Sequence, residues 1–283
     1  MQPPDRFVSA PAERKAAILD VIRQARGRIA LSLFRCNEGD IFTELSRAVL
    51  RGVGVDVLVT STAKGGKTKI DKLWGRLQST GARIHAYSDP VVKYHAKYVV
   101  ADDGPAIVAS LNFTRKCFER THDALVITHD PDVVDTLQRM MEADRQGLPL
   151  PEHLSGRLII GPECARRQLT ALIDGARSSI RLIDAKLSDP DLVTLLNARA
   201  AAGLSVELYG SKQIGGLKSH GKIMLVDDRL AVVGSLALTA LSLDFRREVA
   251  IILDEPSAIA AIQDVFRAAG ASDRRASAAP SHG

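Results

Sequence analysis

Two stretches of the chain repeat one pattern of polar residues. The first runs from His95 as "HAKYVVADDGPAIVASLNFT", and the second runs from His220 as "HGKIMLVDDRLAVVGSLALT". Each has a lysine two positions after the histidine, an aspartate five positions after the lysine, and a Ser-Leu pair further on. Alternate residues of a strand face the same way, so Lys97 and Lys222 are expected to project beside their histidines. An imidazole and an ammonium group held together could attack, protonate or bind an anionic group.

The recurrence reflects a duplication. A shift of 151 residues aligns Pro11–Leu31 with Pro162–Leu182, and the register holds without a gap through residue 60. The histidine motifs are only 125 residues apart, so the first copy carries 26 extra residues between about 61 and 94. A single His-x-Lys pair is typical of a solvated strand end, but two matched copies in a duplicated scaffold favour a functional role.

The elements that must position these residues alternate between helix and strand. Apolar residues recur at helical spacing in 13–24 and 163–173, and alternating strands follow at 53–60 and 204–210. This pattern predicts an α/β fold of two duplicated halves, each with a mixed sheet flanked by helices. The halves are expected to pack about a pseudo-twofold axis, with the active site at their interface. The predicted organisation is a first half at 10–145, a linker at 146–156, a second half at 157–270 and a disordered tail at 271–283.

The composition is that of a soluble globular protein. Of the 283 residues 46% are apolar, and the formal net charge of +5 favours anionic partners. The three cysteines and the histidines outside the motifs have no metal-ligand spacing, so free buried thiols and no metal site are expected. The N-terminus lacks the apolar stretch of a signal peptide, and no apolar run approaches the ~18–20 residues of a membrane span. These features predict a cytoplasmic monomer with an internal pseudo-dimer, and they leave peripheral association with an anionic membrane open.

The two motifs resemble the HxK(x)4D(x)6GSxN motifs of the phospholipase D superfamily. The resemblance rests on "HAKYVVAD…ASLN" and "HGKIMLVD…GSLA", and the duplicated halves around them cover roughly residues 10–270. That superfamily includes phospholipases D, cardiolipin and phosphatidylserine synthases, and nucleases. The resemblance implies a phosphodiesterase that works without a metal or another cofactor, through a phosphohistidine intermediate.

By this resemblance each motif supplies half of one catalytic centre. His95 is the expected nucleophile and His220 the acid that protonates the leaving oxygen, although the residues alone leave their order open. An imidazole with a pKa near ~6.5 suits either task at neutral pH. Lys97 and Lys222 are expected to hold the nonbridging phosphate oxygens as charge develops. Three further side chains are expected to assist them at the phosphate: Ser110, Asn112 and Ser235.

An acidic residue follows each motif at the same distance. Asp123 and Glu248 each lie 28 residues after the histidine of their own half, and each opens an apolar strand. In the superfamily an acid at this place hydrogen-bonds a catalytic histidine and raises its basicity. The sequence leaves open whether the acid serves its own half or the other. The motif aspartates, Asp102 and Asp227, end their strands before a turn and are expected to be structural.

Two positions depart from the superfamily motif. Ala109 stands in place of a glycine, and Ala237 stands in place of the asparagine that Asn112 supplies in the first half. Loss of one hydrogen-bond donor to a developing oxyanion can cost ~3 kcal/mol. The site is therefore expected to be asymmetric, with the nucleophile on the half that keeps its asparagine.

The phosphodiester itself is left open. The extra segment of the first half is rich in basic residues and holds the chain's one tryptophan: Lys64, Lys67, Lys69, Lys72, Arg76 and Trp74. It fits either a solvated helix face with the tryptophan in the core, or a basic flap that grips a nucleic-acid backbone or an anionic lipid headgroup. The 4% aromatic content offers few stacking platforms for nucleic acid. Phospholipid hydrolysis or transphosphatidylation is the first hypothesis, an endonuclease the alternative, and a catalytically weakened phosphodiester-binding protein the third.

Overall fold

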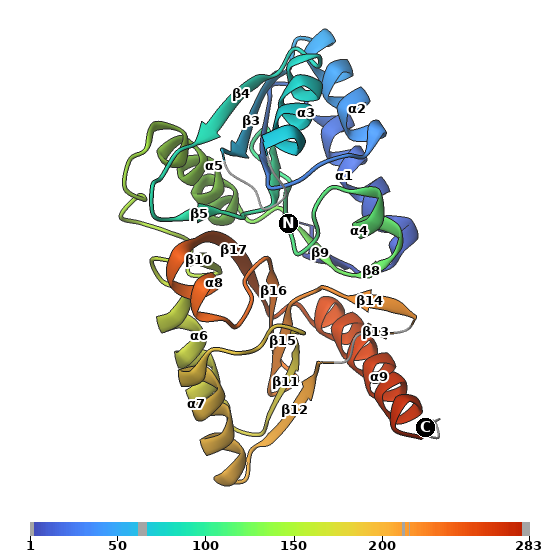
Figure 1. Ribbon diagram of the computed structural model, residues 1–283, viewed down its shortest axis with the longest axis vertical. Coiled ribbons are helices and arrows are strands. Elements are labelled where there is room, and N and C mark those ends of the chain that lie inside the picture. Colours follow the sequence, from blue (N-terminus) through green and yellow to red (C-terminus); the bar gives the residue numbers. More distant parts are fainter. Residues whose placement is uncertain (1–2, 62–66, 211–212, 215, 279–283) are drawn as a thin grey trace.

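The chain folds into two mixed sheets that share a buried core, with helices on both faces of each sheet (Figure 1). The structure is a computed structural model that describes residues 3–61, 67–210, 213–214 and 216–278. The predicted α/β class with mixed sheets flanked by helices is confirmed.

The first sheet combines parallel and antiparallel strands. In spatial order its strands are β1 (Arg6–Val8), β9 (Leu125–Thr128), β7 (Ala106–Ala109), β6 (Tyr98–Ala101), β2 (Arg28–Leu33), β3 (Gly54–Thr60) and β4 (Arg83–Tyr87). The last three are parallel to one another, and the others pair antiparallel. One face packs against α1 (Pro11–Gln24), α2 (Gly39–Leu50) and α3 (Lys67–Gln78), and the other against α5 (Pro131–Gln146). The short helix α4 (Arg115–Glu119) follows β7.

The second sheet repeats this order. Its strands are β10 (Leu158–Gly161), β17 (Arg246–Leu253), β16 (Leu230–Gly234), β15 (Ile223–Val226), β11 (Ser179–Ile183) and β12 (Ser205–Tyr209). Its helices are α6 (Ala165–Asp174) and α7 (Pro190–Ala201) on one face, α9 (Pro256–Ala278) on the other, and α8 (Ala240–Phe245) after β16. In spatial order its six strands occupy the places of the first six strands of the first sheet, as expected for a duplicated chain.

The extra residues of the first half add α3 and the edge strand β4. Leu73 of α3 is buried against the sheet, and Trp74 packs partly buried against the same core. Lys69 and Lys72 are exposed on the opposite side of the helix. The described part of the segment is therefore a helix with an apolar inner face and a solvated basic outer face. Two of its lysine side chains lie outside the described residues: Lys64 and Lys67.

The first and last elements of the fold lie near the predicted boundaries. Strand β1 lies before residue 10 and pairs with β9. Helix α9 ends at Ala278, inside the segment 271–283 for which the sequence predicts a tail. Alanine and arginine, which dominate this segment, have high helix propensities. Residues 279–283 lie outside the described part of the chain.

The two halves exchange short strands. In the first exchange β5 (Lys93–Tyr94) of the first half pairs in parallel with the start of β17 in the second half. In the other, β14 (Leu217–Ser219) of the second half pairs in parallel with β8 (Thr121–His122) of the first half, and antiparallel with β13 (Gln213–Ile214) of its own half. The two exchanged strands are related by the same 125-residue offset as the motifs. Each of them ends directly before a motif histidine.

The halves also share a core. One buried cluster holds side chains of β6, β7 and β9 together with side chains of β15, β16 and β17, including Tyr98, Val126, Leu225 and Val249. Neither sheet alone could bury these apolar side chains from water, so the halves form one folding unit. Of the helices in the described part of the chain, none combines the length and apolar character that crossing a bilayer requires.

A buried arginine anchors the strand that pairs with β5. Arg247 Nε lies 2.9 Å from Oδ1 of Asp144 on α5, and its Nη1 donates to the Gly161 carbonyl at 2.9 Å and contacts Glu163. The backbone oxygen of Arg247 accepts a hydrogen bond of 2.9 Å from the His95 amide. Breaking a buried ion pair typically costs about 3–5 kcal/mol because the remaining charge stays buried. Arg247 therefore fixes β17 against α5 and holds the first motif in place.

Candidate active site

Each motif histidine and lysine lie in a connection between two strands. His95–Lys97 join β5 to β6, and His220–Lys222 join β14 to β15. The sequence predicts that each motif begins a strand, but the strands that follow the motifs begin only at Tyr98 and Ile223. The chain passes here from a strand paired with the other half to a strand of its own sheet. Each motif is thus held by the other half on one side and by its own half on the other.

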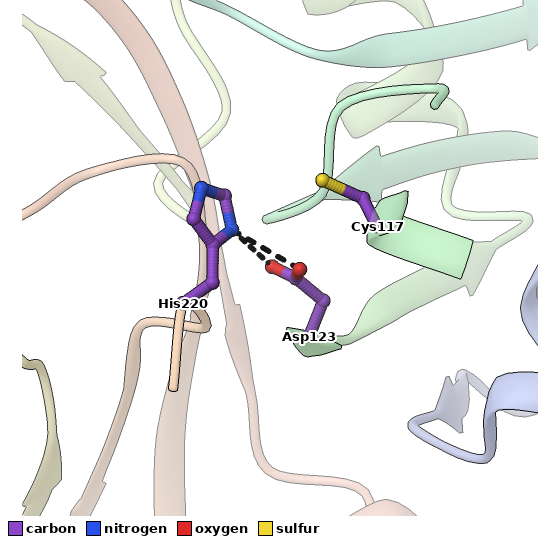
Figure 2. A group of neighbouring side chains, drawn as sticks. All are labelled: Cys117, Asp123 and His220. Carbon is purple, nitrogen blue, oxygen red and sulfur yellow. Dashed lines mark hydrogen bonds and ion pairs between the residues drawn. The ribbon is translucent and has the colours of Figure 1, made fainter. Parts of the chain in front are cut away.

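Each acid serves the histidine of the opposite half. His95 Nδ1 lies 3.0 Å from Oε1 of Glu248, and His220 Nδ1 lies 2.8 Å from Oδ1 of Asp123. Figure 2 shows the second of these pairs, in which the carboxylate faces the ring nitrogen across the boundary between the halves. The strand exchange is the cause: β5 leads to His95 beside the strand of Glu248, and β14 leads to His220 beside the strand of Asp123. This settles the partner question that the sequence left open.

The lysines occupy matching positions. Lys97 Nζ donates to the backbone oxygen of His95 at 2.6 Å, and Lys222 Nζ donates to that of His220 at 2.7 Å. Lys97 Nζ also lies 3.3 Å from Nε2 of His95. Both lysines are buried, and so are both carboxylates. Two buried ammonium groups and two buried carboxylates balance one another, which lowers the cost of burying all four charges.

The buried charges shift several pKa values. Burial, followed by the charge of Lys97, lowers the pKa of His95 to about 3, so this imidazole is neutral at physiological pH. Burial, with a further contribution from the charge of Lys222, lowers the pKa of Lys97 to about 7. Burial alone would raise the pKa of Asp123, but the hydrogen bond and charge of His220 and the charge of Lys222 outweigh it, and that pKa falls below its usual value.

The two half-sites form one electrostatic centre. Burial would raise the pKa of Glu248, but His95 together with the charges of Lys97 and Lys222 lowers it. Glu248 therefore responds to lysines from both halves, and so does His95. Arg246 adds a cationic group at this point, with its Nη1 3.6 Å from Oε1 of Glu248.

The two motif serines lie behind the acids. Ser110 Oγ donates to Oδ1 of Asp123 at 2.7 Å and accepts from the Ala124 amide at 2.9 Å. Ser235 Oγ donates to the Val249 carbonyl at 3.3 Å and accepts from its amide at 3.1 Å. Both serines are fully buried, and their hydroxyls hydrogen-bond to neighbouring groups of the protein. Ser110 orients Asp123, and Ser235 ties β16 to β17.

Asn112 and Ala237 make the centre asymmetric. Asn112 is 9% exposed, and within the described part of the chain its Oδ1 has no hydrogen-bond partner. Ala237 is buried at the matching place in the other half. A buried amide without a partner costs free energy unless a ligand engages it. The free Oδ1 can accept a hydrogen bond from a donor group of a ligand, whereas a phosphate oxygen would have to be bound by the NH2 group of Asn112.

Phe34 is a site residue that the sequence analysis missed. Its ring packs edge-on against the His95 imidazole with centroids 4.6 Å apart, and Lys97 Nζ lies 5.5 Å from its centroid. The 151-residue register places Ala185 at the corresponding position of the second half. A bulky aromatic residue at a strand end, opposite an alanine in the other copy, could have marked this position as different between the two halves. Phe34 shields His95 from water and thereby contributes to its burial.

The motif aspartates hold turns away from the histidines. The Asp102 carboxylate accepts three backbone hydrogen bonds, from the amides of Arg26, Gly27 and Arg28, at 2.7–2.9 Å. The Asp227 carboxylate accepts the corresponding bonds from the amides of 177–179 at 2.7–3.1 Å. Both aspartates have positive φ angles, 49° and 53°, which these bonds help to maintain. Their carboxylates therefore brace the segment that enters β2 or β11.

A cysteine adjoins the second histidine–acid pair. Figure 2 shows Cys117 of α4 with its sulfur directed toward Asp123 and His220. Its Sγ, one Asp123 oxygen and a His220 ring nitrogen all lie within 4.8 Å of one another. Cys36, Cys117 and Cys164 are all free and buried. The grouping was invisible in the sequence because the three side chains come from positions 117, 123 and 220 and meet only through the exchange of β8 and β14.

This arrangement can transfer a phosphoryl group between oxygen atoms. Each imidazole has its Nδ1 held by a buried carboxylate, which leaves Nε2 as the reactive nitrogen. Lys97 places an ammonium group beside the His95 ring, 3.1 Å from Nδ1 and 3.3 Å from Nε2, and Lys222 bonds to the backbone oxygen of His220. One neutral imidazole can attack phosphorus while the other exchanges a proton with the leaving or entering oxygen.

Comparison with known proteins agrees with this chemistry. The model of a protein family described as "Cardiolipin synthase, PLD-like domain" matches residues 18–145 and 202–269, well over half of the chain. Among curated proteins, cardiolipin synthase B of Salmonella typhimurium is 24% identical over an aligned stretch of 311 residues. The match covers 84% of this chain and 73% of that protein.

Solved structures share the fold. The polyphosphate kinase of Porphyromonas gingivalis superposes with a TM-score of 0.77 at 20% identity, over 92% of this chain and 46% of the kinase, so this chain spans just under half of that protein's length. The phosphatidylserine synthase of Haemophilus influenzae superposes with a TM-score of 0.71 at 13% identity, over 93% of this chain and 86% of the synthase. With the family match and the paired motifs, these likenesses lead to one conclusion: the chain belongs to the phospholipase D superfamily.

Proposed function

We propose that this protein is a phosphodiesterase that transfers the phosphoryl group of a phospholipid through a phosphohistidine on His95. The observation that carries the proposal is the pair of crossed histidine–acid contacts, His95 with Glu248 and His220 with Asp123. Each contact engages Nδ1 of one imidazole and leaves Nε2 as the nitrogen available for reaction. A two-step transfer requires two such imidazoles, one that forms the covalent intermediate and one that exchanges protons with the leaving and entering oxygens.

In the first step the neutral His95 attacks phosphorus through Nε2. Its low pKa keeps this nitrogen unprotonated, and Glu248 stabilises the positive charge that the ring gains as the N–P bond forms. The P–O bond to the leaving group breaks, and the leaving oxygen takes a proton from Nε2 of His220. Lys97, 3.3 Å from the attacking nitrogen, is placed to neutralise charge on the nonbridging oxygens.

The second step reverses these roles. His220 accepts a proton from water or from an alcohol, and the resulting oxygen attacks phosphorus as the N–P bond to His95 breaks. Asp123 stabilises the imidazolium in this step and fixes the tautomer of the neutral ring. The Asp123 carboxylate is in turn held by the hydroxyls of Ser110 and Thr121. Water as the acceptor gives hydrolysis, and an alcohol gives a new phosphodiester.

Several observations support a lipid as the substrate. The matching family and the curated relative both carry the name of cardiolipin synthase. Phe245 is 48% exposed directly before Arg246, whose guanidinium lies near Glu248. Leu241 on the same short helix is also exposed. Apolar side chains next to a cationic phosphate site suit a molecule with an anionic headgroup and acyl chains, and they suit peripheral contact with an anionic bilayer.

A substrate panel tests this proposal. The protein is incubated with phosphatidylglycerol or phosphatidylcholine vesicles, with and without glycerol, and separately with single- and double-stranded DNA and RNA. We expect headgroup release or exchange from lipid that persists in EDTA and is lost in His95→Asn. Cleavage of nucleic acid without lipid turnover would establish the endonuclease instead. Absence of turnover on every substrate would leave a phosphodiester-binding protein and contradict the enzyme.

The pH dependence provides a second test. Because the pKa of Lys97 is about 7, the free enzyme loses this cationic group above neutral pH, and kcat/KM is expected to fall about tenfold per unit on the alkaline side. A bound phosphate favours the ammonium form, so the alkaline limb of kcat is expected at higher pH than that of kcat/KM. Both profiles are measured with a chromogenic phosphodiester. A kcat/KM that stays level between about pH 7 and pH 9 would contradict this assignment of Lys97.

A further inference from the structure

We propose that Cys117, Asp123 and His220 form a binding site for one thiophilic divalent cation, with zinc as the type case, and that the bound ion switches the catalytic centre off. Figure 2 shows the three side chains converging from both halves of the chain. The site itself follows from their geometry. Its inhibitory effect rests on the proposed function, because it depends on the role of His220.

The donor atoms are already gathered. One sulfur, one carboxylate oxygen and one imidazole nitrogen lie within 4.8 Å of one another. Ligand atoms around a tetrahedral zinc ion lie about 3–4 Å apart, given bond lengths of about 2.0–2.3 Å. Small side-chain rotations would therefore bring all three into a coordination shell. Water, or an oxygen of a bound anion, would take the fourth position.

The chemistry of the donor set favours zinc over harder ions. Thiolate and imidazole are preferred ligands of zinc, whereas magnesium and calcium prefer sites made of oxygen atoms alone. Asp123 contributes a carboxylate that the surrounding hydrogen bonds and charges keep ionised. Binding would release the Cys117 thiol proton to solvent and leave the His220 ring proton on Nε2. The thiolate and the carboxylate then balance the two charges of the ion.

The protein holds two of the ligands in place before any ion arrives. Arg14 is fully buried, and its Nη1 donates to the Cys117 carbonyl at 3.1 Å and to the Thr121 carbonyl at 2.9 Å. This guanidinium fixes the end of α4 against β8. Ser110 and Thr121 hold the Asp123 carboxylate by their hydroxyl groups. A preorganised donor set loses less conformational entropy when the metal binds.

The other histidine has no such neighbour. The 125-residue register places Ser242 at the position of Cys117 in the second half. Its Oγ accepts a hydrogen bond of 2.9 Å from the Ala237 amide, which already occupies the hydroxyl. We therefore expect one ion per chain, on the His220 side. That side supplies the acid and base of the proposed reaction.

The ion would block catalysis by displacing the Asp123 contact. Nδ1 of His220 can bind either the carboxylate through its proton or the metal through its lone pair. With the metal on Nδ1, the ring can no longer become an imidazolium that Asp123 stabilises. Proton transfer to the leaving oxygen and from the incoming water or alcohol would then both fail.

Cobalt and zinc titrations test the site in matched variants. Cys117→Ala removes the soft donor, and Cys36→Ala removes another buried thiol of the same apolar cluster as the control. Cobalt(II) is expected to give a thiolate-to-cobalt charge-transfer band with one equivalent in the wild type and in Cys36→Ala, but not in Cys117→Ala. Zinc inhibition is measured relative to each variant's own rate in EDTA. Loss of a ligand is expected to raise the zinc concentration for half inhibition at least about tenfold, since even outer-sphere changes cost 10–100-fold in affinity.

The outcomes separate this site from the proposed reaction. Absence of the thiolate band in the wild type, or equal zinc inhibition of the wild type and Cys117→Ala, would overturn the proposal. If the protein turns over no phosphodiester, the proposed function fails, and the cobalt spectrum still decides whether the site exists. Circular dichroism checks the folding of each variant, and Cys117→Ser provides a second replacement of nearly equal volume.

Discussion

His95→Asn is expected to lower kcat for any phosphodiester by at least about 10⁴-fold, whereas His220→Asn stops the reaction half-way on an activated substrate. Asparagine cannot form the covalent intermediate, so loss of His95 removes the whole pathway. Nitrophenolate leaves without needing a proton, so His220→Asn can still form the phosphohistidine from a bis-nitrophenyl phosphate. It then lacks the base that activates water. We expect one rapid equivalent of nitrophenolate per chain from His220→Asn, followed by very slow turnover.

The choice of leaving group is the control for this experiment. A poor leaving group, such as an alkyl alcohol or a lipid headgroup, needs the proton of His220, and the burst should disappear with it. His95→Asn should give no burst with either substrate. A burst from His95→Asn, together with none from His220→Asn, would reverse the two roles while leaving the two-step mechanism in place.

The crossed acids give the second large effect. Glu248→Gln is expected to slow attack by His95, and Asp123→Asn is expected to slow proton transfer by His220, each by about 10²–10⁴-fold in kcat, because a neutral amide cannot stabilise the imidazolium. The two variants should differ in their dependence on the leaving group. Asp123→Asn should be most damaging when the leaving oxygen needs a proton, and Glu248→Gln should be equally damaging for good and poor leaving groups.

Asp103→Asn is the matched control for these acids. Asp103 follows the first motif aspartate and is fully exposed, 3.6 Å from Arg28. Its replacement removes one negative charge without touching the buried centre, so kcat should stay unchanged. If each acid served its own half, the leaving-group pattern would be exchanged, with Glu248→Gln sensitive to the proton requirement. Thermal unfolding of both acid variants shows whether any loss of rate comes from lost folding.

The sequence was sufficient for the parts of the site that the duplication repeats. The motif histidines and lysines, and the two acids at equal spacing, could be identified because each occurs twice in register. The same repeat explains why the strands of the two sheets follow one shared order. What a repeat cannot show is which half a side chain faces, since both copies are alike in that respect.

The crossing of the acids depends on strands too short to recognise in a sequence. β5 contains two residues and β14 contains three, and neither has a measurable alternation of apolar and polar residues. Their partners lie in the other half of the chain. Ser110 and Ser235 are buried where β7 meets β9 and β16 meets β17, each within its own sheet. The sequence could not show that their hydroxyls bond there.

Local composition explains the remaining differences. Phe34 and Cys117 reach the centre from elements outside the motifs, where a lone aromatic or thiol is most often part of the core. The extension of α9 to Ala278 reflects helix propensity in a segment whose small and polar residues suggested disorder. For Phe34 and Cys117 the tertiary context decides the outcome, and for α9 the local helix propensity does.

The most direct test of the account is the mass of the intermediate. His220→Asn is mixed with bis-nitrophenyl phosphate, quenched in alkali to protect the acid-labile N–P bond, digested and analysed by mass spectrometry. We expect one nitrophenyl-phosphoryl group on the peptide that contains His95, and none in the His95→Asn variant treated in the same way. An adduct on the His220 peptide of His95→Asn, or no adduct in either variant, would contradict this expectation.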